Sequence, residues 1–113
     1  LPRLIGVSLA KELIFTGDRL TAAQAHKIGL VNHVCGDFDL ATVKAIEIAT
    51  KIGEKGPIAI RAAKKAIDTG IEKTLTQGLE VEDECYKLVL NSEDRLEGLL
   101  AFAEKRKPTY HGK

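Results

Sequence analysis

The side chains of this sequence that could carry chemistry are three histidines, two cysteines, a run of acids and a basic cluster near the C-terminus. His26, His33 and His111 have no serine, cysteine or aspartate arrangement nearby that would activate a nucleophile. A lone histidine without such partners seldom takes part in catalysis. We therefore expect none of the three to be catalytic.

Cys35 and Cys85 lie too far apart in the sequence to match a metal-binding motif. Buried free thiols are the ordinary state of such residues, and the absence of a disulfide framework favours a reducing compartment. No glycine-rich phosphate loop occurs. The sequence thus predicts no metal site and no bound cofactor.

A run of acids between residues 80 and 84 is the next candidate for chemistry. A carboxylate pair or a hard-metal site is conceivable, but helical spacing spreads these side chains around the surface. We expect a solvated acidic face made by Glu80, Glu82, Asp83 and Glu84.

The basic cluster ends the stretch SEDRLEGLLAFAEKRKP, residues 92–108, where Lys105, Arg106 and Lys107 follow Phe102 by one turn. Cations in the last turn of a helix offset its negative end by about 0.3–1 kcal/mol each. Alternatively, several cations and an aromatic ring converge to bind a phosphate. Composition alone favours the first interpretation.

Helical periodicity and capping signals place these residues on elements. Apolar spacing predicts helices over 7–16, 39–53 and 57–72, with Asp39 as the N-cap of the second. Two capping boxes, Thr21 with Gln24 and Thr74 with Gln77, open further helices. Ser92 caps the last helix. Short strands near 19–20 and 30–34 would flank the helix after Thr21, giving one small βαβ element.

Length and composition set the remaining limits. The 113 residues are 44% hydrophobic and carry a net charge of +1, so one small globular domain is expected, with no nucleic-acid or membrane partner. The chain begins with Leu1 rather than Met, which suggests a fragment or a processed product. Three Phe and no Trp make a modest core, and the apolar faces of 39–53 and 57–72 favour self-association.

Two longer stretches resemble a known family. LPRLIGVSLAKELIFTGDRLTAAQAHKIGLVNHV and RLEGLLAFAEKRKP are similar to the C-terminal part of enoyl-CoA hydratases, the crotonase family, and most similar to its methylglutaconyl-CoA and short-chain members. The resemblance implies a mainly α chain with one short βαβ element, from the helical end of the α/β crotonase spiral. Residues 1–36 would end the spiral core, and residues 37–113 would form the helical region for oligomerisation and CoA contact.

The resemblance also implies a function. The intact protein would add water across the 2,3 double bond of an acyl-CoA thioester as a trimer or hexamer, in the bacterial cytoplasm or the mitochondrial matrix. The catalytic positions would precede Leu1, so the chain would hold no catalytic residue and would not hydrate crotonyl-CoA alone. By this resemblance Phe102 lies near the adenine of CoA and Lys105 meets its 3′-phosphate. For Arg106 and Lys107 we keep the interpretation that they offset the negative end of the helix. An enoyl-CoA isomerase, another family enzyme or a non-catalytic helical association module are the alternatives.

Overall fold

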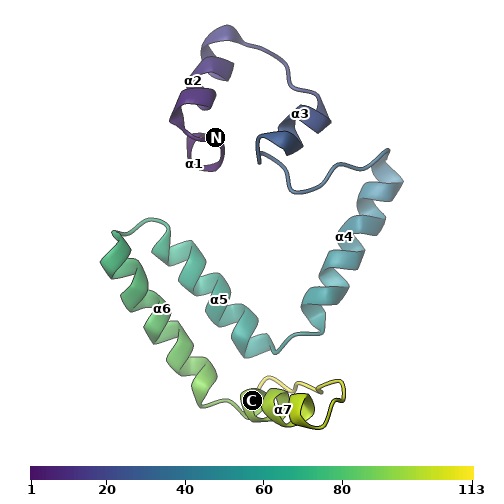
Figure 1. Ribbon diagram of the computed structural model, residues 1–113, viewed down its shortest axis with the longest axis vertical. Helices are drawn as coiled ribbons and strands as arrows, with labels where there is room; N and C mark the ends of the chain where they lie inside the picture. Colours follow the sequence, from purple (N-terminus) through teal and green to yellow (C-terminus); the bar gives the residue numbers. More distant parts are fainter. The chain divides into compact units, whose positions relative to one another are not determined.

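The computed structural model describes residues 1–113, and every regular element in it is a helix. The elements are α1 (Pro2–Ile5), α2 (Val7–Thr16), α3 (Ala22–Lys27), α4 (Phe38–Gly53), α5 (Pro57–Gly70), α6 (Leu75–Leu90) and α7 (Glu93–Ala103) (Figure 1). The chain forms two compact units, Leu1–Ile46 and Glu47–Lys113, so α4 begins in the first and ends in the second.

In the first unit, α1 contacts α2, and the helix predicted over 7–16 is confirmed as α2. Gly17 ends it in the left-handed conformation, with φ 70°, and its N–H donates to Leu13 O. Glycine adopts this conformation without a steric penalty, which is why it commonly ends helices. Ala10 is buried, whereas Val7 and Ile14 of the predicted apolar face remain exposed.

The predicted βαβ element is wrong. Its helix exists as α3, opened by the predicted capping box of Thr21 and Gln24, but residues 19–20 and 30–34 form no strand. Two such short segments could exchange few hydrogen bonds, and an isolated pair of strands is marginal in water. Val31 and Val34 are 40% and 46% exposed, so no neighbouring sheet covers them within this chain.

The start of α4 also differs from the prediction. The Asp37 Oδ1 atom accepts a hydrogen bond of 2.8 Å from Leu40 N, so Asp37 caps this helix. Asp39, the predicted cap, lies inside the first turn. An N-cap aspartate binds the N–H two or three residues ahead of it, and Asp37 has the right offset from the helix start.

In the second unit, α5 and α6 lie side by side as an antiparallel pair (Figure 1). Gly56 and Pro57 start α5, and the capping box of Thr74 and Gln77 starts α6, as predicted. The pair approaches closely at Gly70, where an added Cβ would lie 3.7 Å from Gly78 Cα. Small residues therefore set the distance between the two helices.

The buried side chains of this pair are also small. Ala62 of α5 is 6% exposed and Cys85 of α6 is 3% exposed. The apolar residues that repeat at helical spacing over 57–72 include Ile67 and Ile71, which are 66% and 65% exposed. The helix thus packs on α6 through its alanine side and leaves Ile67 largely exposed.

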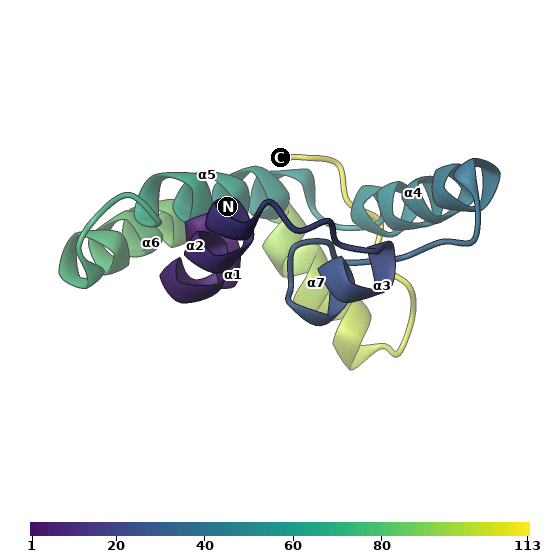
Figure 2. The ribbon, with the colours of Figure 1, turned by 90° about the horizontal axis from the view of Figure 1, so that it is seen from above.

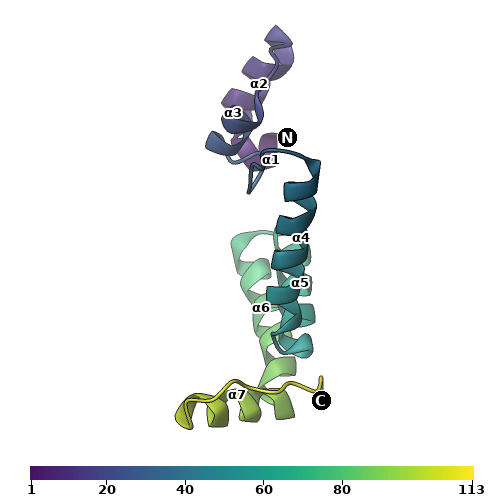
Figure 3. The same cartoon turned by 90° about the vertical axis from the view of Figure 1, so that its right-hand side faces the viewer.

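Helix α7 begins at the predicted cap. Ser92 Oγ accepts from Arg95 N at 3.2 Å and donates to Val89 O at 2.8 Å. Beyond α7 the chain turns back, and the tail of residues 104–113 runs beside the helix that it leaves (Figure 2 and Figure 3). Its last residue reaches the start of α7, where Asp94 N donates to Lys113 O.

Candidate functional site

Phe102 and Lys105, the two residues expected to contact CoA, lie at the C-terminal end of α7. The Phe102 side chain is 86% exposed, the largest exposed fraction among the large hydrophobic residues. Lys105 is exposed too, and its ammonium group makes no ion pair or side-chain hydrogen bond. An aromatic ring and an unpaired cation are thus both open to solvent at this helix end.

The backbone at Lys105 closes the helix. Lys105 N donates to Phe102 O at 3.2 Å and Arg106 N donates to Ala101 O at 3.0 Å, which is the Schellman arrangement. Lys105 occupies its left-handed position, with φ 55°, and no other non-glycine residue of the chain has a positive φ. Gly29 fills the same position after α3. A side chain in this conformation costs about 1 kcal/mol relative to glycine.

Arg106 is held by two carboxylates. Its Nη1 and Nη2 atoms donate to Glu97 at 2.6 and 2.9 Å, and its Nε atom donates to Glu104 at 2.6 Å. This bidentate pair, with the N–H of Thr109 donating to Glu97 Oε1 at 2.8 Å, lowers the pKa of Glu97 to about 2. The hydrogen bonds to Glu97 and to Glu104 raise the pKa of Arg106.

Lys107 pairs with Glu54, whose carboxylate lies 2.7 Å from the Lys107 ammonium. The hydrogen bond and the charge of Lys107 lower the pKa of Glu54. Since α7 ends at Ala103, neither Arg106 nor Lys107 lies in its last turn. The helix-end interpretation of these two cations is therefore wrong. They bind carboxylates instead, and of the three adjacent cations only Lys105 has no carboxylate partner.

Asp94 fastens the tail at the other end of α7. Its Oδ1 atom accepts from His111 N at 2.7 Å and its Oδ2 atom accepts from Gly112 N at 2.9 Å. Asp94 is 5% exposed, which is rare for an acid unless its oxygens are paired. The histidine takes part through its backbone and not through its ring.

Sequence reasoning missed the roles of Asp94 and Glu97. The two residues are three apart, so they share one face of the helix. The available signal in the sequence was this acid pair, which comes shortly before a basic tail. The signal does not predict that the acids contact the tail, because the chain reversal at Lys105 is what brings the two together.

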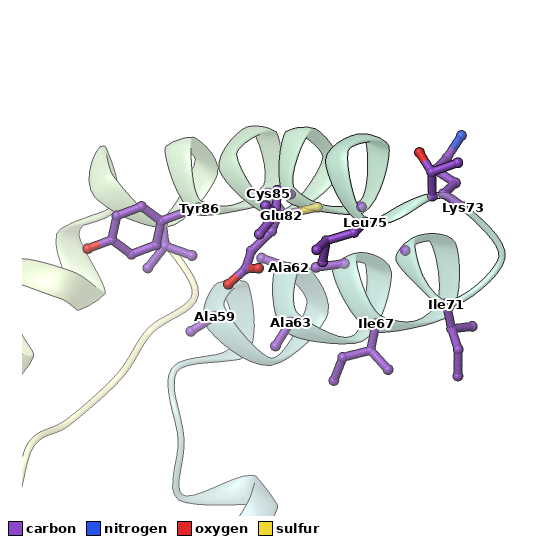
Figure 4. Close-up of a pocket in the computed structure, with 16 residues that line it drawn as sticks. Ala59, Ala62, Ala63, Ile67, Ile71, Lys73, Leu75, Glu82, Cys85 and Tyr86 are labelled. Atoms are coloured by element: carbon purple, nitrogen blue, oxygen red, sulfur yellow. The ribbon is translucent and has the colours of Figure 1, made fainter. Parts of the chain in front are cut away.

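A groove of about 770 Å³ lies between α5 and α6 (Figure 4). Its lining is mainly alanine, glycine and apolar side chains, and its polar members are Lys73, Thr74, Glu82 and Tyr86. Cys85 lines the groove as a buried free thiol, while Cys35 is free and half-buried. No pair of groups suited to acid–base or nucleophilic chemistry meets in this groove.

The other candidates from the sequence form no site. The rings of His26, His33 and His111 are exposed, and no cluster of three or more histidine, cysteine or acidic residues could hold a metal ion. The acids of residues 80–84 are exposed, as expected for a solvated face, and Asp83 pairs with Lys87 of the next turn. No helix has the length and apolar character needed to cross a membrane.

Comparison with known proteins agrees with the resemblance seen in the sequence. A family model described as enoyl-CoA hydratase/isomerase matches residues 1–113. The chain is 59% identical over 112 residues to probable enoyl-CoA hydratase 2, mitochondrial, of Arabidopsis thaliana, covering 99% of this chain and 37% of that protein. It is 48% identical over 115 residues to methylglutaconyl-CoA hydratase, mitochondrial, of Mus musculus, with 99% and 37% covered.

Solved structures give the same result. The 1.8 Å crystal structure of enoyl-CoA hydratase from Bacillus anthracis matches with a TM-score of 0.92 and 54% identity, covering 99% of this chain and 43% of that one. The chain thus spans less than half the length of these relatives. Since the family model extends over all of its residues, the chain belongs to the enoyl-CoA hydratase/isomerase family.

Proposed function

We propose that this chain is the CoA-contacting, helical part of an enzyme that adds water across the 2,3 double bond of an enoyl-CoA thioester. The thioester is the substrate, and no separate cofactor is needed. Phe102 would lie against the adenine and Lys105 would bind the 3′-phosphate. The observation that carries the proposal is the end of α7, where an open ring stands one turn before the one cation of the cluster without a counterion.

The chemistry of such a reaction needs two further parts. Oxyanion donors would stabilise the thioester enolate, and an acid–base pair would handle the water and the proton. We assign neither to residues of this chain, in which no suitable groups converge. The relatives are named as hydratases, whereas the family also includes isomerases, so an isomerase or another acyl-CoA enzyme of the family remains the closest alternative.

The size of the expected contact follows from its exposure. An exposed ion pair contributes about 0–1 kcal/mol, so Lys105 changes affinity for a phosphate by roughly fivefold at most. We expect the chain by itself to bind CoA at best in about the millimolar range. Such binding is measurable by NMR titration of the backbone amides near Phe102 and Lys105.

The test compares CoA with 3′-dephospho-CoA. Lys105→Ala should weaken CoA binding by about three- to fivefold and leave dephospho-CoA binding nearly unchanged. Lys107→Ala is the matched control, because it removes a cation two residues away that is already paired with Glu54. Equal losses for the two ligands in Lys105→Ala would show that the lysine does not read the 3′-phosphate.

A helical association module is the second candidate function. Specific exposed residues favour it: Val43 of α4 is 62% exposed and Ile67 of α5 is 66% exposed, although both are apolar. Exposed apolar side chains of this kind commonly mark contacts with other chains. The two functions are compatible, since a trimeric or hexameric enzyme would need such contacts as well as a CoA site.

The relatives come from two cellular compartments, and we propose one or the other for this protein. Similar proteins include mitochondrial ones from Arabidopsis thaliana and mouse and a bacterial one from Bacillus anthracis. The bacterial cytoplasm and the mitochondrial matrix are both reducing, which suits the two free cysteines. We propose no nucleic-acid partner, because the net charge of +1 offers no basic surface as a whole.

A further inference from the structure

We infer that Glu97 is a positioning residue for Lys105: by binding Arg106 and Thr109, which follow residue 105, it ties the reversed chain to α7 and holds the lysine in a fixed direction for phosphate binding. The inference rests on the proposed function, since it assigns a partner to the same site. Glu97 itself would touch no ligand.

The grip consists of three hydrogen bonds to one carboxylate. Two come from the guanidinium of Arg106, the residue directly after Lys105, at 2.6 and 2.9 Å. The third comes from the backbone N–H of Thr109, at 2.8 Å. Glu97 lies in the body of α7, so its oxygens tie the reversed chain to the rigid helix that precedes it. The Glu97 and Arg106 side chains are 23% and 39% exposed, and the bidentate geometry of the pair fixes the direction of the guanidinium.

The backbone of Lys105 needs such a grip. Left-handed φ is unfavourable for a lysine, and the chain uses glycine at the equivalent position after α3. Without the contacts of Glu97, Arg106 and Thr109 would no longer be tied to the body of α7. The turn would keep its two backbone hydrogen bonds and the pairs of Arg106 with Glu104 and of Lys107 with Glu54. A lysine on a loose turn samples many directions and loses more freedom when it binds a phosphate.

Electrostatics alone makes the opposite prediction, and this gives the inference its test. Glu97 is an anion near the site, so removing its charge should strengthen binding of an anionic ligand if only charge mattered. If Glu97 acts by holding the turn, removing its charge should weaken binding. Glu97→Gln changes the charge while keeping the shape of the side chain, and the sign of its effect separates the two accounts.

The experiment is an NMR titration of the full 113-residue chain with CoA and with 3′-dephospho-CoA. Glu97→Gln should weaken CoA binding by about two- to threefold and leave dephospho-CoA binding unchanged. The readout is the ratio of the affinity for CoA to the affinity for 3′-dephospho-CoA, because a general loss of structure would lower both affinities together. Unchanged or tighter CoA binding in Glu97→Gln overturns the inference.

Two further variants serve as controls. Glu54→Gln removes the same charge from the neighbouring pair with Lys107, at 2.7 Å, without touching the turn, and should leave the ratio unchanged or raise it. Arg106→Lys keeps the positive charge but loses the bidentate hydrogen bonds to Glu97, so it should lower the ratio as Glu97→Gln does. If Arg106→Lys leaves the ratio unchanged in a folded chain, the contacts between Glu97 and Arg106 do not orient Lys105.

The failure of the proposed function has a different signature. Lys105→Ala with an unchanged ratio would refute the phosphate site itself. If Lys105→Ala lowers the ratio but Glu97→Gln leaves it unchanged, only the positioning role of Glu97 is refuted. In the Lys105→Ala background, Glu97→Gln should have no further effect on the ratio, and a full additional loss there would show that Glu97 acts through another group.

Discussion

Asp94 offers the sharpest test of how the C-terminal tail is held. Asp94→Asn keeps the size of the side chain but replaces one accepting oxygen by an NH₂ group. That group then faces the N–H of His111 or Gly112, where Asp94 now accepts at 2.7 and 2.9 Å. One hydrogen bond to a charged acceptor is lost, for about 1.5–3 kcal/mol, and a donor is left unpaired. The loss cannot exceed the free energy of docking the tail, because the tail can swing into water. We therefore expect destabilisation of tail docking by about 2 kcal/mol.

Amide hydrogen exchange measures this directly. A loss of about 2 kcal/mol corresponds to roughly 30-fold faster exchange of the His111 and Gly112 amides. Glu93→Gln is the matched control, since Glu93 carries the same charge in the same first turn but is exposed, and its side chain makes no hydrogen bond or ion pair with the tail. It should change stability by less than about 0.5 kcal/mol. Equal effects of the two variants would refute the reasoning, because both would then act only through the helix dipole.

Two other predictions concern pH and association. The pKa of Glu97 is lowered in the folded chain from 4.5 to about 2, so the stability that it contributes is fully present above pH 4.5 and is lost as the pH falls toward 2. The Thr109 amide should therefore lose protection from hydrogen exchange between pH 4.5 and 2. Glu97→Gln cannot titrate and should abolish this pH dependence. In sedimentation at increasing concentration, the chain should show a mass above its 12.3 kDa, and replacing both Val43 and Ile67 by lysine should lower it toward that value. A concentration-independent mass of 12.3 kDa for the unaltered chain would contradict the association argument.

Local signals in the sequence predicted the helices well. Capping boxes involve residues three apart, so the boxes at Thr21 and Thr74 and the cap at Ser92 are decided within one turn. The prediction failed where a distant partner decides. Residues 30–34 have the composition of a strand, but a strand exists only with a neighbour to pair with. The proposed boundary between residues 36 and 37 refers to the whole family fold and stays a prediction.

The face that each helix buries was harder to predict than the helix itself. On α5 the apolar spacing pointed to the isoleucines, yet the helix buries Ala62 against α6. Close approach of two helices requires small residues at the contact, as Gly70 and Gly78 show. An apolar pattern identifies which side chains avoid water, but it does not say whether their partner lies in the same chain. The exposed isoleucines are consistent with a partner outside it.

Charge at the candidate site is decided in the same way by contacts far apart in the sequence. The three adjacent cations carry +3, and the acids that approach them, Glu54, Glu97 and Glu104, carry −3, so the cluster as a whole is neutral. A neutral cluster could hold no anion if its charges were evenly paired. They are not, because Arg106 takes two of the acids and Lys107 the third. Lys105 is thereby left as a local positive charge beside an exposed ring, on a turn whose geometry favours glycine. The backbone cost of keeping a side chain there is the strongest physical reason to assign that side chain a function, and the phosphate of CoA is the anion that we propose for it.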